Sequence, residues 1–499
     1  MIAVSRPVRI AALVVAALFL AAWLVDLAGL PGGIPRHLVV VSIDTLRGGH
    51  LSISGYGVPT SPRLDAIAAR GTTFLRAYSP SGWTVPAHMS LFTGLLPPAH
   101  GLVDFPDAGR LGPNYVTLAE TLRASGFRTA AFTGGGFLSP QHGFEDGFER
   151  FVSRGRHFET KTGDVKDWIS SLGEEDRFFV FLHGFDVHRP YRPPEAYARR
   201  FAERAVPGAG GGPLVADRLF PLLEDLAVVA KRAKDPAAAF RTRPPDEDLA
   251  LIESQYDAEI ARADDVLGDL LDWMDERGLL SETLLVVVSD HGEEFFEHGG
   301  LDHVHTLYDE LLHVAWFMAG PNVPRGRSVV SPVGLVDVMP TVCELLDVPL
   351  RAPVQGGSRV GLAEASEDEE KGRGRGDALF AFAGYSGYPY RLDSVRVGGY
   401  KLVRWRLSGM RDAALGPDRE HFTLQFRDER EDFVELFHVA EDPGETRDLS
   451  RERADVVAAL SDMIDEEVAA SAAFAAEPGE RPRITREYLE ELRSLGYLR

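Results

Sequence analysis

Val39-Val-Val-Ser-Ile-Asp44 is an apolar, β-branched run that ends in a carboxylate. Two later runs end in acid and histidine side chains, namely Phe178-Phe-Val-Phe-Leu-His-Gly-Phe-Asp-Val-His188 and Leu284-Leu-Val-Val-Val-Ser-Asp-His291. Continuous apolar runs of this length are typical of strands buried on both faces of a largely parallel sheet. Arg128–Thr133 and His313–Gly320 are further runs of this kind. The sequence therefore predicts an α/β fold around a mostly parallel sheet.

Helical patterns lie between these runs. Residues 60–71 begin with Thr-Ser-Pro and end in Gly, which are start and stop signals of a helix. Leu251 to Gly278 predicts a long amphipathic helix whose buried stripe contains Ile252, Tyr256, Ile260, Leu267, Leu270, Leu271 and Met274. Helices between buried strands are expected to cover both faces of the sheet.

Composition excludes several classes of protein. The chain has 499 residues, 44% hydrophobic and 26% charged, which fits a folded protein of two or three domains. Its formal net charge of −22 argues against general nucleic-acid binding. The single cysteine, Cys343, excludes an intramolecular disulfide framework and a Cys-rich zinc site.

The N-terminus has the pattern of an export segment. Arg6 and Arg9 precede an uninterrupted apolar run from Ile10 to Val25. Small-x-small cleavage signals are not evident, so we favour an uncleaved N-terminal anchor over a cleaved signal peptide. The positive residues then stay inside and the remainder is exported. We expect a cell-membrane protein with an extracytoplasmic catalytic domain, or a periplasmic or secreted protein if the segment is cleaved.

The body of the chain divides at two polar, Gly-rich stretches. We expect an anchor or signal segment at 1–34, a catalytic domain at 35–360 with an insertion at about 200–250, a linker or exposed loop at 361–376, and a C-terminal subdomain at 377–499. Ala378–Ala383, Ser394–Val397 and Tyr400–Arg406 predict antiparallel strands, two of them joined at Gly398-Gly399.

Acidic and histidine side chains follow three of the predicted strands. Asp44, the pair Asp186 and His188, and the pair Asp290 and His291 each stand at a strand end. One such acid is more often a capping group, but the carboxyl ends of parallel strands meet at one edge of the sheet. Carboxylate oxygens with one or two imidazoles suit Zn²⁺, Mn²⁺, Mg²⁺ or Ca²⁺. The pattern therefore predicts a divalent metal at this edge of the sheet.

A helix is expected after Trp83. Thr84 stands two residues before Pro86, which makes it a good N-cap, and the amides of a helix start attract anionic oxygens. A hydroxyl there that also binds a metal is a candidate nucleophile. The simpler interpretation is an ordinary capping threonine.

Several motifs occur in a fixed order: Ser42-Ile-Asp-Thr-Leu-Arg47, Thr60-Ser-Pro-Arg-Leu-Asp65, Ser79-Pro-Ser-Gly-Trp-Thr-Val-Pro-Ala-His-Met-Ser-Leu-Phe-Thr-Gly94, Phe185-Asp-Val-His-Arg-Pro-Tyr191, Tyr256-Asp-Ala-Glu-Ile260, Ser289-Asp-His-Gly-Glu-Glu-Phe-Phe-Glu-His-Gly299, His303-Val-His-Thr-Leu-Tyr-Asp-Glu310, the tail segment Glu435–Leu449 and the terminal Leu492–Leu498. This series resembles the sulfatase branch of the alkaline-phosphatase superfamily. The resemblance implies an alkaline-phosphatase-like, doubly wound, mostly parallel sheet flanked by helices, with a smaller C-terminal antiparallel sheet plus helix.

The resemblance also implies roles for individual residues. Asp44, Asp290 and His291 match metal ligands, and Thr84 matches the nucleophile, which also contacts the metal. Arg47 and His188 match groups that stabilise the ester anion. The histidine near the leaving group or a second metal is matched by His303 or His305, with His305 preferred as the proton donor. A second metal set would draw on Asp186, His188, His303 and His305, although Asp186 has the alternative role of holding His188.

Two positions depart from the family pattern. Sulfatases of the formylglycine type carry Cys or Ser where this chain has Thr84, and a guiding Arg where it has His88. The second acid of the usual Asp-Asp pair is Thr45. The phosphoesterases and phosphoethanolamine transferases of the superfamily resemble this site better, because they use a threonine directly.

Three functions are predicted. The first is an exported, metal-dependent hydrolase that cleaves phosphate or sulfate esters through a metal-activated Thr84. The second is a membrane-anchored phospho-group transferase of the phosphoethanolamine type, and the third is an inactive, sulfatase-like binding protein. The expected substrate is a small-molecule, glycan or lipid-linked ester, with no nucleic acid and with membrane contact through the N-terminal segment.

Overall fold

The computed structural model describes residues 33–105, 108–208, 243–365, 378–385, 390–407, 432–477 and 479. Most of the expected anchor, much of the expected insertion and linker, and the terminal Leu492–Leu498 motif lie outside the described residues. Among the helices that the structure describes, none has the length and apolarity needed to cross a bilayer.

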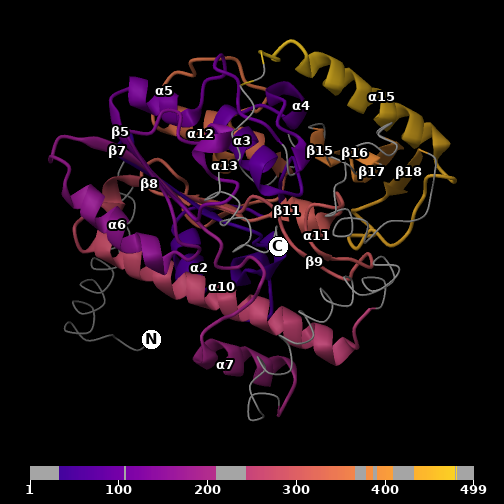
Figure 1. Ribbon diagram of the computed structural model, residues 1–499, viewed down its shortest axis with the longest axis horizontal. Helices are drawn as coiled ribbons and strands as arrows, with labels where there is room; N and C mark the ends of the chain where they lie inside the picture. The colour runs from indigo at the N-terminus through magenta and orange to yellow at the C-terminus, as the bar shows by residue number, and fades with distance from the viewer. Residues whose placement is uncertain are drawn as a thin grey trace, which may run out of the picture.

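An eight-stranded sheet forms the centre of the molecule (Figure 1). Its strands, in spatial order, are β13 (Arg327–Val329), β2 (Thr72–Phe74), β12 (Trp316–Ala319), β8 (Thr283–Val288), β1 (His37–Ile43), β7 (Arg177–Gly184), β5 (Phe127–Thr133) and β6 (Arg150–Ser153). β1 is parallel to β7 and β8, and β5 is parallel to β7 and β6. The predicted mostly parallel sheet is thus confirmed.

β12 departs from the prediction. The run expected as one strand is divided at Ala315 into β11 (His313–Val314) and β12. β12 runs antiparallel to β8 and β2, whereas β11 pairs with β3 (Ala77–Tyr78), which also pairs with β14 (Val333–Gly334). An apolar run buried on both faces gives no sign of its direction, so the sequence does not show this reversal.

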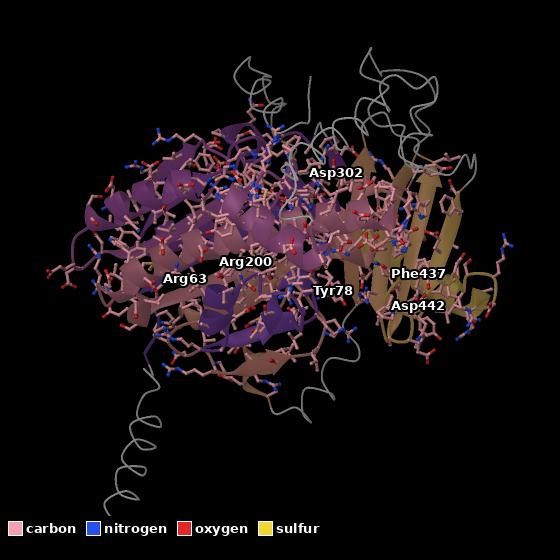
Figure 2. The ribbon with its side chains drawn as sticks, turned by 90° about the horizontal axis from the view of Figure 1, so that it is seen from below. Arg63, Tyr78, Arg200, Asp302, Phe437 and Asp442 are labelled. Atoms are coloured by element: carbon pink, nitrogen blue, oxygen red, sulfur yellow. The ribbon has the colours of Figure 1, made fainter. Side chains whose placement is uncertain are left out.

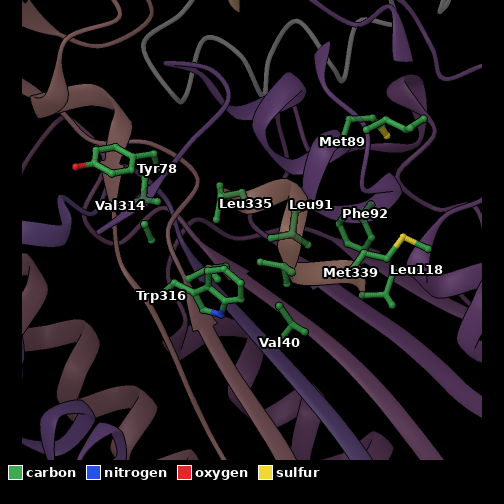
Figure 3. Close-up of a cluster of buried hydrophobic side chains, with 14 of the residues drawn as sticks. Val40, Tyr78, Met89, Leu91, Phe92, Leu118, Val314, Trp316, Leu335 and Met339 are labelled. Carbon is green, nitrogen blue, oxygen red and sulfur yellow. The ribbon is translucent and has the colours of Figure 1, made fainter. Parts of the chain in front are cut away.

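Both faces of the sheet are buried because the side chains of β1 alternate between two cores. Leu38 and Val40 belong to the core under α3 (Thr84–Thr93), α5 (Leu118–Ala124) and α12 (Val338–Leu345). Figure 3 shows Val40 close to side chains of these helices. Val39 and Val41 belong to the opposite core, under α2 (Pro62–Ala68), α6 (Glu159–Ser170) and α10 (Asp246–Asp275). α10 is the predicted long helix, and Figure 1 shows it along the lower face with α7 (Glu195–Ala205) beside it.

A second sheet stands beside the first (Figure 2). It contains β18 (Phe433–Phe437), β17 (Tyr400–Leu407), β16 (Tyr390–Val397), β15 (Leu379–Tyr385) and β4 (Asp104–Phe105). The first four are antiparallel, and β4 adds a parallel edge from much earlier in the chain. Helix α15 (Ala454–Ser471) packs on this sheet through Leu460 and Ile464. The predicted C-terminal antiparallel sheet plus helix is confirmed.

Short elements complete the described chain. The helices are α4 (Pro97–His100), α11 (Asp309–Leu312) and α13 (Val360–Glu364). The two-stranded sheet contains β9 (Glu294–Phe295) and β10 (Leu301–Asp302). The 3-10 turns are Gly48–His50, Ser52–Ser54, Pro140–His142, Leu280–Glu282 and Leu335–Asp337. β9 and β10 follow β8 directly, so they start where the central sheet ends.

Candidate active site

Asp44, Asp290 and His291 meet at the carboxyl edge of the central sheet. Asp44 follows β1, and Asp290 lies two residues beyond the end of the adjacent parallel strand β8. The three residues are buried, and each offers a ligand atom within 4.8 Å of the others. The structure thus brings together the three residues that the sequence analysis assigned to a metal.

Three hydrogen bonds hold the loop after β1 against this group. Thr45 has a positive φ of 58°, an unusual backbone conformation for a β-branched residue. Its amide donates a hydrogen bond to Asp290 Oδ1 at 3.2 Å. The Tyr256 hydroxyl on α10 donates to the Thr45 carbonyl and accepts from the Arg47 amide, both at 2.8 Å. The long helix therefore fixes the turn that places Asp44.

The two carboxylates fit a cation. Burial, followed by the nearby charge of Asp290, holds the pKa of Asp44 well above its usual range. Asp290 is buried as well, but its neighbours His291, His88 and His183 lower its carboxyl pKa. Asp44 Oδ1 and Asp290 Oδ2 have no hydrogen-bond partner within the described residues. Buried carboxylate oxygens without partners are costly, and a divalent cation would satisfy both.

His291 presents a lone pair to the same space. Its Nδ1 donates to the Gly292 carbonyl at 2.9 Å, so Nε2 carries the lone pair. Nε2 lies 3.4 Å from Asp290 Oδ2 and 3.5 Å from Thr84 Oγ1. This tautomer suits a metal ligand.

Thr84 is the first residue of α3, and its role as an N-cap is not supported. The N-cap position is held by Trp83, and the N-terminus of α3 has no side-chain cap. The helix therefore begins one residue earlier than expected, and the Thr84 hydroxyl faces His291. Thr84 is 1% exposed, so its hydroxyl is held within the site.

His88 connects the helix of Thr84 to β1. Its Nδ1 donates to the Thr84 carbonyl at 2.9 Å and lies 3.5 Å from Asp290 Oδ2. Its Nε2 accepts from the Ser42 hydroxyl at 2.8 Å. Burial lowers the pKa of His88 to about 4, so the imidazole is uncharged at neutral pH. A neutral donor therefore occupies the position at which the family resemblance expects an arginine.

His183, on β7, orients Asp44, a role that the sequence analysis missed. Its Nδ1 accepts the Gly134 amide at 3.3 Å, so Nε2 carries the proton and donates to Asp44 Oδ2 at 3.1 Å. Burial lowers the His183 pKa to about 3. The register pairs His183 with Ser42 near the end of β1, and this pairing cannot be seen in the sequence.

A second acid–histidine group lies beside the first. His303 Nδ1 is 2.8 Å from both Glu293 Oε1 and Asp302 Oδ1. The His303 ring centroid is 4.5 Å from that of His291 and 4.9 Å from that of His188. Glu293, Asp302 and His303 are close enough to offer ligand atoms to one ion. The charges of the two acids raise the His303 pKa well above its usual range against the opposing effect of burial.

His305 and Asp186 contact other groups and do not join Glu293, Asp302 and His303. His305 Nε2 contacts Glu294 Oε2 at 2.7 Å, and its Nδ1 donates to the His303 carbonyl. Asp186 Oδ2 accepts the Phe158 amide at 2.8 Å, and Oδ1 faces His157 at 3.6 Å. The two acids in this set are Glu293 and Asp302, and the motif Asp290–Glu294 contains the first of them.

Arg47 also has a different partner from the one expected. Its guanidinium pairs with Glu297 Oε1 at 2.7 Å and lies over the Phe295 ring. In this conformation Glu297 holds the Arg47 guanidinium. An ester anion would have to compete with Glu297 for that guanidinium.

The protein therefore has an α/β fold with a buried group of candidate metal ligands at the carboxyl edge of its central sheet. The sulfatase family profile matches residues 36–348, more than half of the chain. The chain belongs to the sulfatase family. This family generally binds a divalent metal, and the Asp44, Asp290 and His291 group offers candidate ligands.

Named relatives match part of the chain, and solved structures share its fold. Arylsulfatase K of Rattus norvegicus is 24% identical over 66% of this chain, and the match spans 62% of that relative, which is less than two thirds of its length. Arylsulfatase K of Homo sapiens is 25% identical, with 68% of each chain covered. The phosphonate monoester hydrolase of Agrobacterium radiobacter has a TM-score of 0.66 at 19% identity, covering 88% of this chain and 96% of the other. A protein solved with its substrate D-glucosamine-2-N, 6-O-disulfate has a TM-score of 0.66 at 18% identity, covering 89% and 100%.

Replacing Asp44 by Asn is expected to stabilise the metal-free protein as pH rises. The pKa of the Asp44 carboxyl is higher in the folded than in the unfolded protein. Asp44 therefore causes no loss of folding stability at a pH below its unfolded pKa, and folding stability falls as the pH rises through its folded pKa. Asn carries no charge, so in a chelator the melting temperature of Asp44→Asn should exceed that of the parent by about 1–3 °C at neutral pH, with no difference near pH 4. Asp290→Asn is the control. Its carboxyl pKa is lowered, so no such gain is expected. A gain of equal size in both variants would contradict this account.

Replacing His183 is expected to weaken metal binding. His183→Leu leaves Asp44 Oδ2 without its donor and should raise the metal dissociation constant by about 10- to 100-fold. His183→Gln, which keeps an N–H donor, should restore part of the affinity. His100→Gln changes a buried histidine bonded to Ser90 and serves as the matched control. Equilibrium dialysis with Zn²⁺ and Mn²⁺ measures the effect, and unchanged binding by the Leu variant would refute the role of His183.

Proposed function

We propose that this chain is a metal-dependent hydrolase of phosphate or sulfate esters in which Thr84 Oγ1 is the nucleophile. The observation that carries the proposal is the position of Thr84. Its hydroxyl stands in the first turn of α3 and lies 3.5 Å from His291 Nε2, beside the buried pair of carboxylates. Membership of the sulfatase family and the names of its relatives support ester hydrolysis.

Asp44, Asp290 and His291 would hold a divalent metal, with Thr84 at its edge, and Zn²⁺, Mn²⁺, Mg²⁺ and Ca²⁺ all suit these donors. Such an ion supplies positive charge for the anionic oxygens of the ester and lowers the pKa of a nearby hydroxyl. Beside this group, Glu293 and Asp302 hold His303, which carries a proton in this proposal and binds no second metal.

The side chains of this chain perform the transfer as follows. Thr84 Oγ1 bonds to phosphorus or sulfur and loses its proton to solvent, while the bond from that atom to the alcohol oxygen breaks. His303 gives a proton to the alcohol oxygen, a role supported by its raised pKa and its position next to His291. His188, whose pKa is held well below its usual range by burial, packs against His303 as a neutral ring. Water then cleaves the ester on Thr84 and restores the hydroxyl.

Phosphate esters are the preferred substrates in this proposal. A threonine sulfate is hard to hydrolyse, because threonine lacks the second hydroxyl of a formylglycine hydrate through which the sulfate is released. A phosphate ester also keeps more negative charge for a cation to hold. His88, in place of the guiding arginine, supports a nucleophile that needs no modification.

The alcohol part of the substrate is proposed as a small molecule, a glycan or a lipid. One structural neighbour was solved with its sulfated glucosamine substrate, and another with a neocarrahexaose. Transfer to a second alcohol in place of water would use the same residues. An inactive protein is less well supported, because two buried carboxylate oxygens stand without partners among the described residues.

Thr84→Ala is expected to reduce turnover by about a thousandfold or more, because the attacking oxygen is lost. Thr84→Ser should keep measurable activity, and Thr84→Val, close in shape to threonine, should be as inactive as Ala. Aryl phosphates, phosphodiesters and aryl sulfates form the assay panel, and phosphates should be turned over faster. Intact-mass analysis during turnover should show a phosphoryl-sized adduct on the peptide around Thr84.

Two further results would test this chemistry. Thr84→Cys, co-expressed with a formylglycine-generating enzyme, should stay unmodified because His88 replaces the guiding arginine. Thr93→Val, at the other end of α3, is the matched control and should be active. Parent-like turnover by the Ala variant, or an adduct on another peptide, would show that Thr84 is not the nucleophile.

We also propose that residues 1–34 anchor the chain in the cell membrane, with residues 35–360 forming an exported catalytic domain and 377–499 a C-terminal subdomain beyond a linker at 361–376. The support is Arg6, Arg9 and the apolar run after them. Fractionation should place the full chain at the membrane, with its bulk digested by protease added from outside. A soluble exported form starting near residue 30 would show cleavage, and a cytosolic protein would refute both versions.

A further inference from the structure

The loop that carries His303 has a strained backbone. Asp302 and Val304, on either side of His303, have φ angles of 89° and 87°, in the left-handed region that residues with side chains rarely adopt. Such conformations persist where surrounding contacts hold them. One such contact is made by the Val304 amide, which donates to the Gly82 carbonyl at 3.0 Å. Gly82 is two residues before Thr84, so the loop is fixed against the segment that carries the proposed nucleophile.

Two carboxylates determine how the His303 ring is turned. The ring Nδ1 lies 2.8 Å from both Glu293 Oε1 and Asp302 Oδ1. An N–H at Nδ1 that donates to these acids leaves Nε2, on the opposite side of the ring, as the nitrogen that can give a proton to another group. Glu293 is 0% exposed, so contacts within the protein decide how its carboxylate lies.

Tyr191 holds the second oxygen of Glu293. Its hydroxyl donates to Glu293 Oε2 at 2.8 Å. Tyr191 is buried, and burial, followed by the charge of Glu293, raises the pKa of its phenol well above the ordinary value, so the hydroxyl stays a donor. Arg189, two residues earlier, forms an ion pair with Asp302, the other acid beside His303. The segment that follows β7 therefore holds both acids.

The ring of Tyr191 has little room to move. It meets the Tyr256 ring edge-on, with centroids 5.7 Å apart, and its centroid lies 6.1 Å from that of Phe295. The Tyr256 hydroxyl holds the turn that places Asp44. Two phenols packed against each other thus serve neighbouring parts of the site: Tyr256 supports the metal-ligand group, and Tyr191 supports the acids beside His303.

We propose that Tyr191 is a positioning residue for the proton transfer to the departing alcohol. Its hydroxyl fixes Glu293, and Glu293 fixes the His303 ring so that Nε2 faces the bond that breaks. The alcohol oxygen keeps the electron pair of that bond and takes the proton from Nε2. Water returns a proton to His303 when it attacks the Thr84 ester. This role rests on the function proposed above and adds a residue that it leaves out.

The test is how the rate depends on the leaving group. Aryl phosphates with a more basic phenol need the proton more, so a turned His303 ring slows them most. Tyr191→Phe keeps the ring and its packing, so a folded protein is expected. It should lower kcat/KM for phenyl phosphate by about tenfold or more, and for 4-nitrophenyl phosphate by about twofold at most. Hydrolysis of the Thr84 ester comes later and does not enter kcat/KM. An equal loss for both esters, or no loss, would overturn the proposal.

Further variants separate positioning from a general loss of structure. Glu293→Gln should show the same leaving-group dependence, and the double variant with Tyr191→Phe should be no slower than Glu293→Gln alone, because the hydroxyl acts through that carboxylate. Additive losses would refute this route. Tyr115→Phe is the matched control. Its buried hydroxyl donates to the Ala99 carbonyl at 2.6 Å, and its loss should leave the ratio of the two rates unchanged.

A measurement without turnover keeps this proposal apart from the proposed hydrolysis. In the full chain with histidine labelled at its ring nitrogens, the proton on His303 Nδ1 should give a downfield magnetic resonance signal. His303→Gln assigns that signal by removing it. Tyr191→Phe should shift the signal or speed its exchange with water by about tenfold, and Tyr115→Phe should do neither.

The two proposals fail differently. If the parent hydrolyses no ester but Tyr191→Phe alters the His303 signal, the proposed hydrolysis is wrong and the orientation of His303 by Tyr191 stands. If the parent hydrolyses aryl phosphates and Tyr191→Phe alters neither the signal nor the leaving-group dependence, the hydrolase stands and the role of Tyr191 is refuted. An altered signal with an unchanged leaving-group dependence would also refute it, because proton transfer would then not depend on Tyr191.

Discussion

Two carboxylates buried side by side impose the main constraint on this structure. Asp44 and Asp290 follow adjacent parallel strands, and both are almost fully excluded from solvent. Two like charges in such a place repel one another, and each also loses its hydration. The surroundings respond with amide and imidazole donors, and two oxygens still remain without partners among the described residues. This arrangement carries a local cost that protonation of Asp44 or a bound cation would reduce.

Two histidines lie next to these carboxylates. His88 and His183 are buried and uncharged, and their rings meet edge-on with centroids 5.3 Å apart. His183 directs its N–H to Asp44, whereas His88 directs its N–H to the Thr84 carbonyl and lies 3.5 Å from Asp290 Oδ2. As a neutral donor, His183 orients Asp44 without cancelling its negative charge.

Much of the fold could be predicted from the sequence because burial on both faces leaves a clear apolar pattern. β1, β5, β7 and β8 lie where the runs placed them, and the hairpin of β16 and β17 turns at Gly398-Gly399. The direction of β12 was not predictable, because an apolar run looks the same in either orientation. In the site, the positions of Asp44, Asp290 and His291 at strand ends were enough to predict that they meet. The positions of Glu293 and His183 could not be predicted, because the first depends on the path of a loop and the second on strand register. Arg47 shows a further limit. The motif places its backbone, but Glu297, 250 positions further along the chain, determines where its guanidinium lies.

The parallel pairing of β4 with β15 links the two sheets in a way that bears on biosynthesis. Asp104 and Phe105 emerge from the ribosome long before Leu379–Tyr385, yet they form one edge of the sheet that those residues build. Until the later strand arrives, this edge has no partner, and unpaired edges recruit other chains. The second sheet is therefore complete only after residues 379–385 have been made, because its β4 edge comes from a segment about 275 positions earlier in the chain.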